Sequence, residues 1–208
     1  MNPKTKRTPA RRRRRTRRWP LFLSLLLILA ILAGVCQGCF GQMSRLKNAQ
    51  LPDWVDSQII PVNGSARRGV TMKRVTDIAI HYVGNPGTSA QANRDYFAQP
   101  DTQVSSHFLI GLEGEVIQCV PLNEKSSATN ERNRDTISIE VCHPDDTGQF
   151  TQASNNSLVK LTAWLCDTAG IGRDHVIRHY DVTGKLCPLY FVAHPDAWEQ
   201  FLAEVKAF

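Results

Sequence analysis

The chain has 208 residues and a formal net charge of +6 at neutral pH, long enough for one domain with a sizeable core and a short appendage. Ten of its basic residues lie within positions 1–18, which leaves 15 basic against 19 acidic residues in the remainder. A nucleic-acid-binding domain spreads its basic residues over a folded face, so this mildly acidic remainder argues against nucleic acid as a partner.

The amino-terminal part predicts a membrane anchor. Residues 1–18 are arginine-rich and lack apolar periodicity, and an uncharged, mostly apolar run follows at 19–40. That run is long enough to cross a bilayer core, which takes roughly 20 residues of α-helix. The positive charge before the run keeps that side in the cytoplasm. We therefore expect a basic cytoplasmic tail, one transmembrane helix, and a cell-membrane protein whose remaining chain lies outside.

A cleaved signal peptide is the alternative interpretation of 19–40, because a charged segment before a short apolar run is typical of it too. No convincing cleavage site follows the run, and residues 33–36 (AGVC) match a lipoprotein processing site imperfectly. An uncleaved anchor is therefore the favoured interpretation, with secretion expected if the segment is cleaved. Both interpretations export the rest of the chain.

The exported part is predicted to be one α/β domain at 58–208, after a weakly periodic linker at 41–57. Runs of apolar and β-branched residues predict an edge strand at 58–62 and strands at 75–83, 106–111, 115–119, 136–142 and 175–179. Apolar stripes with turn signals predict helices at 89–98, 156–169 and 195–206. The short turn at 111–114 makes the second and third of the main strands a hairpin. A hairpin combined with helical crossovers predicts a mixed central β-sheet flanked by helices.

The strands at 75–83 and 136–142 share one pattern, in which aliphatic side chains alternate with small or polar ones. Successive side chains on a strand point to opposite faces. Each strand therefore has an aliphatic face for helices to cover and a second face that carries His81 or Glu140. We expect the second faces to form the floor of a cleft.

Three residues have the side chains of a metal site: His81 and His179 at strand ends, and Cys187 eight residues after His179. A catalytic zinc ion takes three protein ligands and leaves a fourth position for water. The pKa of that water falls to near 7, which makes it a nucleophile at neutral pH. The spacing alone does not decide between this metal site and an alternative without metal. In that alternative, His81 is a surface histidine or one whose hydrogen bonds are satisfied, and Cys187 is a buried thiol.

The six cysteines are too sparse for a disulfide scaffold. With Cys187 assigned to metal, Cys119, Cys142 and Cys166 remain in the domain. We expect buried small apolar side chains, with a disulfide between two of them as the less favoured alternative.

Four blocks of sequence carry a family resemblance: IAIHYVGNPGTSA, SSHFLIGLEGEVIQCVPLNEKSSAT, NRDTISIEV and RHYDVTGKLCP. In this order they resemble N-acetylmuramoyl-L-alanine amidase family 2, the zinc amidases that include amidase-type phage lysozymes and peptidoglycan-recognition proteins. The resemblance covers roughly residues 58–205. It implies a mixed sheet flanked by helices, and hydrolysis of the amide between N-acetylmuramic acid and L-alanine in peptidoglycan.

The resemblance also implies roles for single residues. By position, Zn²⁺ is held by His81, His179 and Cys187. Glu140 matches a glutamate that acts as general base in many bacterial members, and Lys185 matches a residue that stabilises the developing oxyanion.

One departure from the phage-type members is informative. They carry a catalytic tyrosine where this chain has Ser106, and they lack the glutamate that stands here as Glu140. We therefore expect Glu140 to act in place of the tyrosine and give Ser106 no catalytic role. Two further residues are candidates for substrate contact. His107 lines or supports the cleft, with a structural hydrogen bond as the alternative, and Asn85 lies in a turn on the rim.

The expected function is zinc-dependent cleavage of peptidoglycan by a domain tied to the membrane through its amino-terminal helix. Two alternatives remain open. One is a peptidoglycan-binding module without activity, and the other is a zinc peptidase that cuts within the stem peptide. The complete ligand set together with Glu140 favours the amidase.

Overall fold

The computed structural model describes residues 24, 27–28 and 41–208. The predicted basic tail at 1–18 lies outside the described residues, and so does almost all of the predicted transmembrane helix at 19–40. Within the described part of the chain, no helix has both the length and the apolar character needed to cross a membrane.

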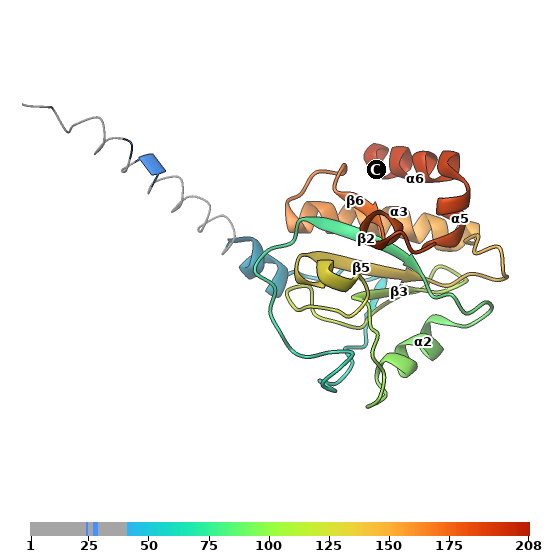
Figure 1. The fold of residues 1–208 in the computed structure, drawn as a ribbon, viewed down its shortest axis with the longest axis horizontal. Coiled ribbons are helices and arrows are strands. Elements are labelled where there is room, and N and C mark those ends of the chain that lie inside the picture. The colour runs from blue at the N-terminus through green and yellow to red at the C-terminus, as the bar shows by residue number, and fades with distance from the viewer. Residues whose placement is uncertain (1–23, 25–26, 29–40) are drawn as a thin grey trace, which may run out of the picture. The chain divides into compact units, whose positions relative to one another are not determined.

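A mixed six-stranded sheet in the order β1-β4-β3-β5-β2-β6 forms the centre of the domain (Figure 1). The β3–β4 pair is an antiparallel hairpin, and the other pairs are parallel, which confirms the predicted mixed sheet. The strands are β1 (Val55–Ser57), β2 (Asp77–Tyr82), β3 (Phe108–Ile110), β4 (Val116–Gln118), β5 (Thr136–Val141) and β6 (Val176–Arg178).

Helices cover both faces of the sheet, with α3, α5 and α6 on one side and α2 on the other (Figure 1). Helix α3 begins four residues before its predicted start, because the Thr151 hydroxyl caps it by accepting a hydrogen bond from the Ser154 amide at 3.0 Å. The helices are α2 (Ala90–Phe97), the 3₁₀ helix η1 (Asn130–Arg134), α3 (Gln152–Ala169), α4 (Tyr180–Thr183), α5 (Leu189–Ala193) and α6 (Pro195–Ala207).

Two separate apolar clusters lie on the two faces of the sheet. The larger one packs the aliphatic face of β2 and β5, including Ile80 and Ile139, against α3 and α6. Burying each such isoleucine contributes about 1.5–3 kcal/mol. The smaller one packs Leu109 and Ile117 of the hairpin against Phe97 of α2. The second face is therefore apolar along the hairpin, while along β2 and β5 it carries His81 and Glu140, as the alternation on those two strands predicts.

Cys119, Cys142 and Cys166 are buried free thiols. Cys119 and Cys142 belong to the smaller cluster and Cys166 to the larger one, so they serve as small apolar side chains.

The predicted linker at 41–57 is instead part of the folded unit Gly38–Phe208. Residues 41–47 are helical. The side-chain amide of Gln42 bonds to the backbone of two residues that are far from it in the sequence. It donates to the carbonyls of Val75 and Ala169 and accepts from the Val75 amide, each at 2.9 Å. β1 then pairs with β4. The segment also packs on the larger cluster, in which Leu46 and Val55 are buried. The tether prediction was wrong because these apolar residues are too irregularly spaced to give a periodic signal.

The edge strand is β1, which lies just before the range 58–62 that the sequence predicts. Residues 58–60 still run beside β4, where the amides of Gln58 and Ile60 donate to the carbonyls of Gln118 and Cys119 at 3.0 and 2.9 Å. The other predicted strands agree with the structure to within two residues at each end.

Candidate metal and catalytic site

Strand register brings His81 and Glu140 together. β2 and β5 run parallel with His81 paired to Glu140, so both side chains leave the sheet on the face opposite the larger core. The His81 Nδ1 atom lies 3.9 Å from Glu140 Oε1. The His81 side chain is 1% exposed and that of Glu140 is 18% exposed. The predicted alternation therefore places this pair correctly.

His179 and Cys187 reach the same place through a closed loop. β6 lies beside β2, and the His179 amide donates to the Ile80 carbonyl at 3.2 Å. The short helix α4 ends at Thr183, and the next residue, Gly184, reverses the chain with a φ of 76°. The loop closes where the Tyr180 amide donates to the Cys187 carbonyl at 2.9 Å. This closure explains how residues eight positions apart come to share one site.

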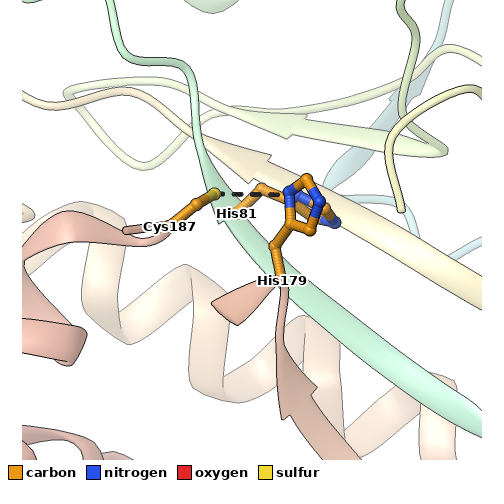
Figure 2. A group of neighbouring side chains, drawn as sticks. All are labelled: His81, His179 and Cys187. Carbon is orange, nitrogen blue, oxygen red and sulfur yellow. Dashed lines mark hydrogen bonds between the residues drawn. The ribbon is translucent and has the colours of Figure 1, made fainter. Parts of the chain in front are cut away.

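The three predicted metal ligands converge, as Figure 2 shows. Their ligand atoms all lie within 4.8 Å of one another, and the three residues are buried. Cys187 Sγ is 3.8 Å from His81 Nδ1, and the two imidazole centroids are 4.7 Å apart. Two ligands of one tetrahedral ion are separated by about 3.5 Å at zinc-like bond lengths. The donor set therefore fits a metal ion with little rearrangement.

Two residues that the sequence analysis did not single out contact the histidines. The Nε2 atom of His81 lies 3.0 Å from Thr129 Oγ1, and that of His179 lies 2.8 Å from Asn130 Oδ1. Each imidazole thereby has one nitrogen engaged and Nδ1 left for a metal.

Burial sets the electrostatics of the ligands. It lowers the pKa of His81 well below the usual value, and it also lowers the pKa of His179, with Lys185 adding to both effects. Burial raises the pKa of the Cys187 thiol to about 12, and the nearby Glu140 adds to this rise. Neutral imidazoles are ready ligands, and a bound cation would convert the thiol to a thiolate.

Glu140 is the carboxyl group beside this cluster. Burial raises its pKa to about 8, and the positive charge of Lys185 opposes the rise. Its Oε2 atom is buried and has no hydrogen-bond partner within the described part of the molecule. A buried carboxyl oxygen without a partner is costly in a purely structural position, so it indicates a group held ready for chemistry.

Lys185 lies in the exposed part of the loop, two residues before Cys187. Its charge acts on both imidazoles, on Glu140 and on the Cys187 thiol. The structure therefore brings together the three metal-ligand candidates and Glu140, with Lys185 on the same loop as Cys187.

His107 has a structural position. Its ring is fully buried and both nitrogens are occupied: Nδ1 accepts from the Ser138 amide at 3.0 Å, and Nε2 donates to the Glu124 carbonyl at 2.9 Å. No ring nitrogen is left for a substrate, so the expected substrate contact is corrected to the alternative, a structural hydrogen bond. Ser106 is also buried, and its hydroxyl donates to the Phe108 carbonyl at 2.7 Å.

Asn85 is exposed in the turn after β2, where its carbonyl accepts a hydrogen bond from the Thr88 hydroxyl at 2.8 Å. Substrate contact by its side chain stays a prediction.

Comparison with known proteins finds the same family by family model and by similar sequences. The family model described as N-acetylmuramoyl-L-alanine amidase matches residues 71–189. The chain is 30% identical over 169 residues to N-acetylmuramoyl-L-alanine amidase BlyA of Bacillus subtilis (strain 168), covering 71% of this chain and 46% of that protein. It is 29% identical over 170 residues to N-acetylmuramoyl-L-alanine amidase CwlL of Bacillus licheniformis, covering 74% and 47%.

The chain thus spans about half the length of the curated relatives it matches. Among solved structures, the catalytic domain of XlyA superposes with a TM-score of 0.64 at 29% identity, covering 73% of this chain and 98% of that domain. The similarity to known proteins therefore includes almost the whole of a catalytic domain.

Proposed function

This chain belongs to the N-acetylmuramoyl-L-alanine amidase family, and on that premise we propose that it hydrolyses the amide bond between N-acetylmuramic acid and L-alanine in peptidoglycan. One observation carries the proposal. Two imidazoles and a thiol converge within 4.8 Å, and beside them lies a carboxyl oxygen of Glu140 that has no hydrogen-bond partner among the described residues. A non-catalytic binding module has no need of a buried carboxyl oxygen that lacks a hydrogen-bond partner.

We propose Zn²⁺ as the metal, held by His81, His179 and Cys187, because imidazole and thiolate ligands together suit this ion. When bound there, Zn²⁺ would supply a Lewis acid and a water activated at neutral pH. The residues beside the ligands then account for the movement of protons and charge.

Glu140 is proposed as the general base and acid. Its pKa of about 8 applies to the protein without a metal, and a nearby positive charge lowers it into the range of a working base. As a carboxylate it takes a proton from the attacking water. It then returns that proton to the nitrogen of the departing L-alanine, so that the peptide leaves as an amine.

Lys185 is proposed to stabilise the negative oxygen that forms when water adds to the scissile carbonyl. Lys185 is exposed, so it lies on the solvent side of the site, from which a substrate arrives. Its positive charge also lowers the pKa of the buried Glu140 and Cys187 side chains. A positioned charge of this kind typically contributes a few kcal/mol to transition-state stabilisation.

Mass spectrometry of the products released from purified peptidoglycan tests the reaction. An amidase releases intact stem peptides that begin with L-alanine, whereas a peptidase releases shorter peptides. Release of shorter peptides alone, or of no product, would refute the proposal. A parallel digest with a zinc chelator should release nothing.

We also propose that the domain works outside the cell membrane, tied to it by the segment at 19–40. The charge asymmetry around that segment supports this orientation, and peptidoglycan lies on that side. Protease added to intact cells without their wall should digest the domain. Protection of the domain until the membrane is broken would contradict this location.

A further inference from the structure

Two consecutive residues at the start of η1 each reach one imidazole of the metal group. Thr129 Oγ1 is 3.0 Å from Nε2 of His81, and Asn130 Oδ1 is 2.8 Å from Nε2 of His179. Thr129 is 0% exposed, so its hydroxyl is shielded from water. One short segment thereby holds both histidines, of which His81 lies in β2 and His179 directly follows β6.

These contacts fix which nitrogen of each ring carries the hydrogen. A neutral imidazole has one donor and one acceptor nitrogen, and an amide oxygen only accepts. Asn130 Oδ1 therefore selects the His179 form with hydrogen on Nε2 and a lone pair on Nδ1. For His81, Nδ1 faces Cys187 Sγ at 3.8 Å, and Nε2 is free to donate to Thr129.

The backbone at Asn130 is unusual. Its φ is 53°, and within the described part of the chain it alone among the residues other than glycine has a positive φ. Asparagine tolerates this left-handed conformation better than most residues. Backbone outliers of this kind cluster at functional sites, where the surrounding structure maintains them.

The surrounding structure does hold this segment. The Asn133 side-chain oxygen accepts hydrogen bonds from the amides of Ala128 and Thr129 at 2.9 and 2.7 Å. In the middle of η1, the Arg132 guanidinium pairs with Asp77, the first residue of β2, and with Asp135, the residue just before β5. The segment is therefore tied to the same two strands that carry His81 and Glu140.

We propose that Thr129 and Asn130 are positioning residues that hold both imidazoles with Nδ1 turned towards the metal. The inference rests on the proposed function, since it concerns the same site. Removing the partner of a metal-binding imidazole typically costs 10–100-fold in metal affinity, because the ring must then be oriented and its tautomer selected during binding.

Two substitutions test the proposal on the full chain, with zinc affinity measured by competition against a chelator. Thr129→Val keeps the shape of the side chain and removes its hydroxyl. Asn130→Gly removes the amide and keeps the positive φ at no steric cost. Thr129→Ser and Asn130→Asp retain an oxygen acceptor, so they serve as conservative variants.

Thr102→Val is the matched control for general destabilisation. Thr102 is buried outside the metal site, and its hydroxyl donates to the Tyr96 carbonyl at 2.7 Å. The thermal midpoint of each metal-free variant is measured alongside its affinity. We expect this control to lower the midpoint and leave zinc affinity unchanged.

We expect zinc affinity to fall 10–100-fold in Thr129→Val and Asn130→Gly, and to stay within about threefold of wild type in the two conservative variants. Wild-type affinity in both disruptive variants would overturn the proposal, and so would an equal loss in Thr102→Val. If Thr129→Val does not fold, Asn130→Gly decides the outcome.

The same data separate this inference from the proposed function. A chain that binds zinc, loses affinity in the disruptive variants and releases no peptide refutes the function and supports the positioning role. An active chain whose variants bind zinc normally refutes the positioning role alone. A wild-type chain without zinc affinity refutes both.

Discussion

The site has two halves that the fold supports in different ways. His81 and Glu140 stand on neighbouring parallel strands whose opposite faces are buried against helices. Lys185 and Cys187 stand on a loop that backbone hydrogen bonds close. The strand half is fixed by the same packing that stabilises the domain, whereas the loop half is held locally. Substitutions in the loop should therefore affect chemistry with little effect on stability.

The largest effect is expected for Cys187→Ser in the loop. Losing the thiolate removes a ligand, so bound zinc and peptide release should both be lost, with activity falling at least about 10³-fold. The thermal midpoint of the metal-free chain should change by only a few degrees, because the loop closes through backbone atoms. Metal analysis and product release check this, and retention of zinc with full activity would contradict it.

Glu140→Gln tests the strand half. Removing the general base while keeping the shape should lower kcat by about 10²–10⁴-fold and leave zinc bound. Metal content should match that of wild type. A variant that keeps zinc and also keeps normal kcat would show that Glu140 is not the base.

The pH dependence of stability in the metal-free chain tests the same residue. The raised pKa means that folding retains a proton on Glu140 that the unfolded chain loses above pH 4.5. The contribution of Glu140 to stability should therefore fall as pH rises from 4.5 through about 8, so the stability of wild type relative to Glu140→Gln should fall over the same range. Denaturant unfolding at several pH values measures this, and parallel curves would contradict the account.

Lys185→Met should have a smaller effect on activity. Its ammonium is exposed, and water screens part of its charge, so a fall in kcat of about 10–100-fold is expected. Stability and zinc content should remain those of wild type. Steady-state rates check the prediction, and a change in KM alone would indicate that Lys185 binds substrate without stabilising the oxyanion.

His107 lies outside both halves, so His107→Gln should affect stability more than chemistry. Burial lowers the pKa of His107 to about 4, so the contribution of this residue to stability should fall by up to about 3 kcal/mol as pH drops from 6.5 to 4, because the unfolded state takes up a proton first. The variant should be less stable at pH 7 and show a flatter decline. An equally steep decline would contradict the buried neutral histidine.

Sequence patterns predicted the strand half of the site well. Two-residue alternation located His81 and Glu140 on one face, since this pattern depends only on neighbouring residues. Residue types and spacing made His179 and Cys187 candidate ligands, and the resemblance decided in favour of the metal site and added Lys185. The role of Thr129 and Asn130 was missed, because a positive φ and contacts across 48 and 49 positions leave no periodic signal.

The same limit explains the errors elsewhere in the fold. Hydrogen bonds from Gln42 to Val75 and Ala169, and irregularly spaced apolar residues such as Leu46, hold 41–57 in the fold without a periodic signal, so the sequence predicts a linker there. His107 is flanked by a strand and was placed in the cleft, although backbone partners occupy both of its ring nitrogens. Local periodicity predicts elements and faces, whereas isolated long-range contacts have to be seen in the structure.

A zinc titration of the metal-stripped chain tests the central claim most directly, with release of peptides that begin with L-alanine as the readout. The account predicts no release without zinc, a rise in proportion to added zinc, and a plateau at about one ion per chain, as expected for one three-ligand site. Full release by the stripped chain, or no release at any zinc concentration, would contradict it.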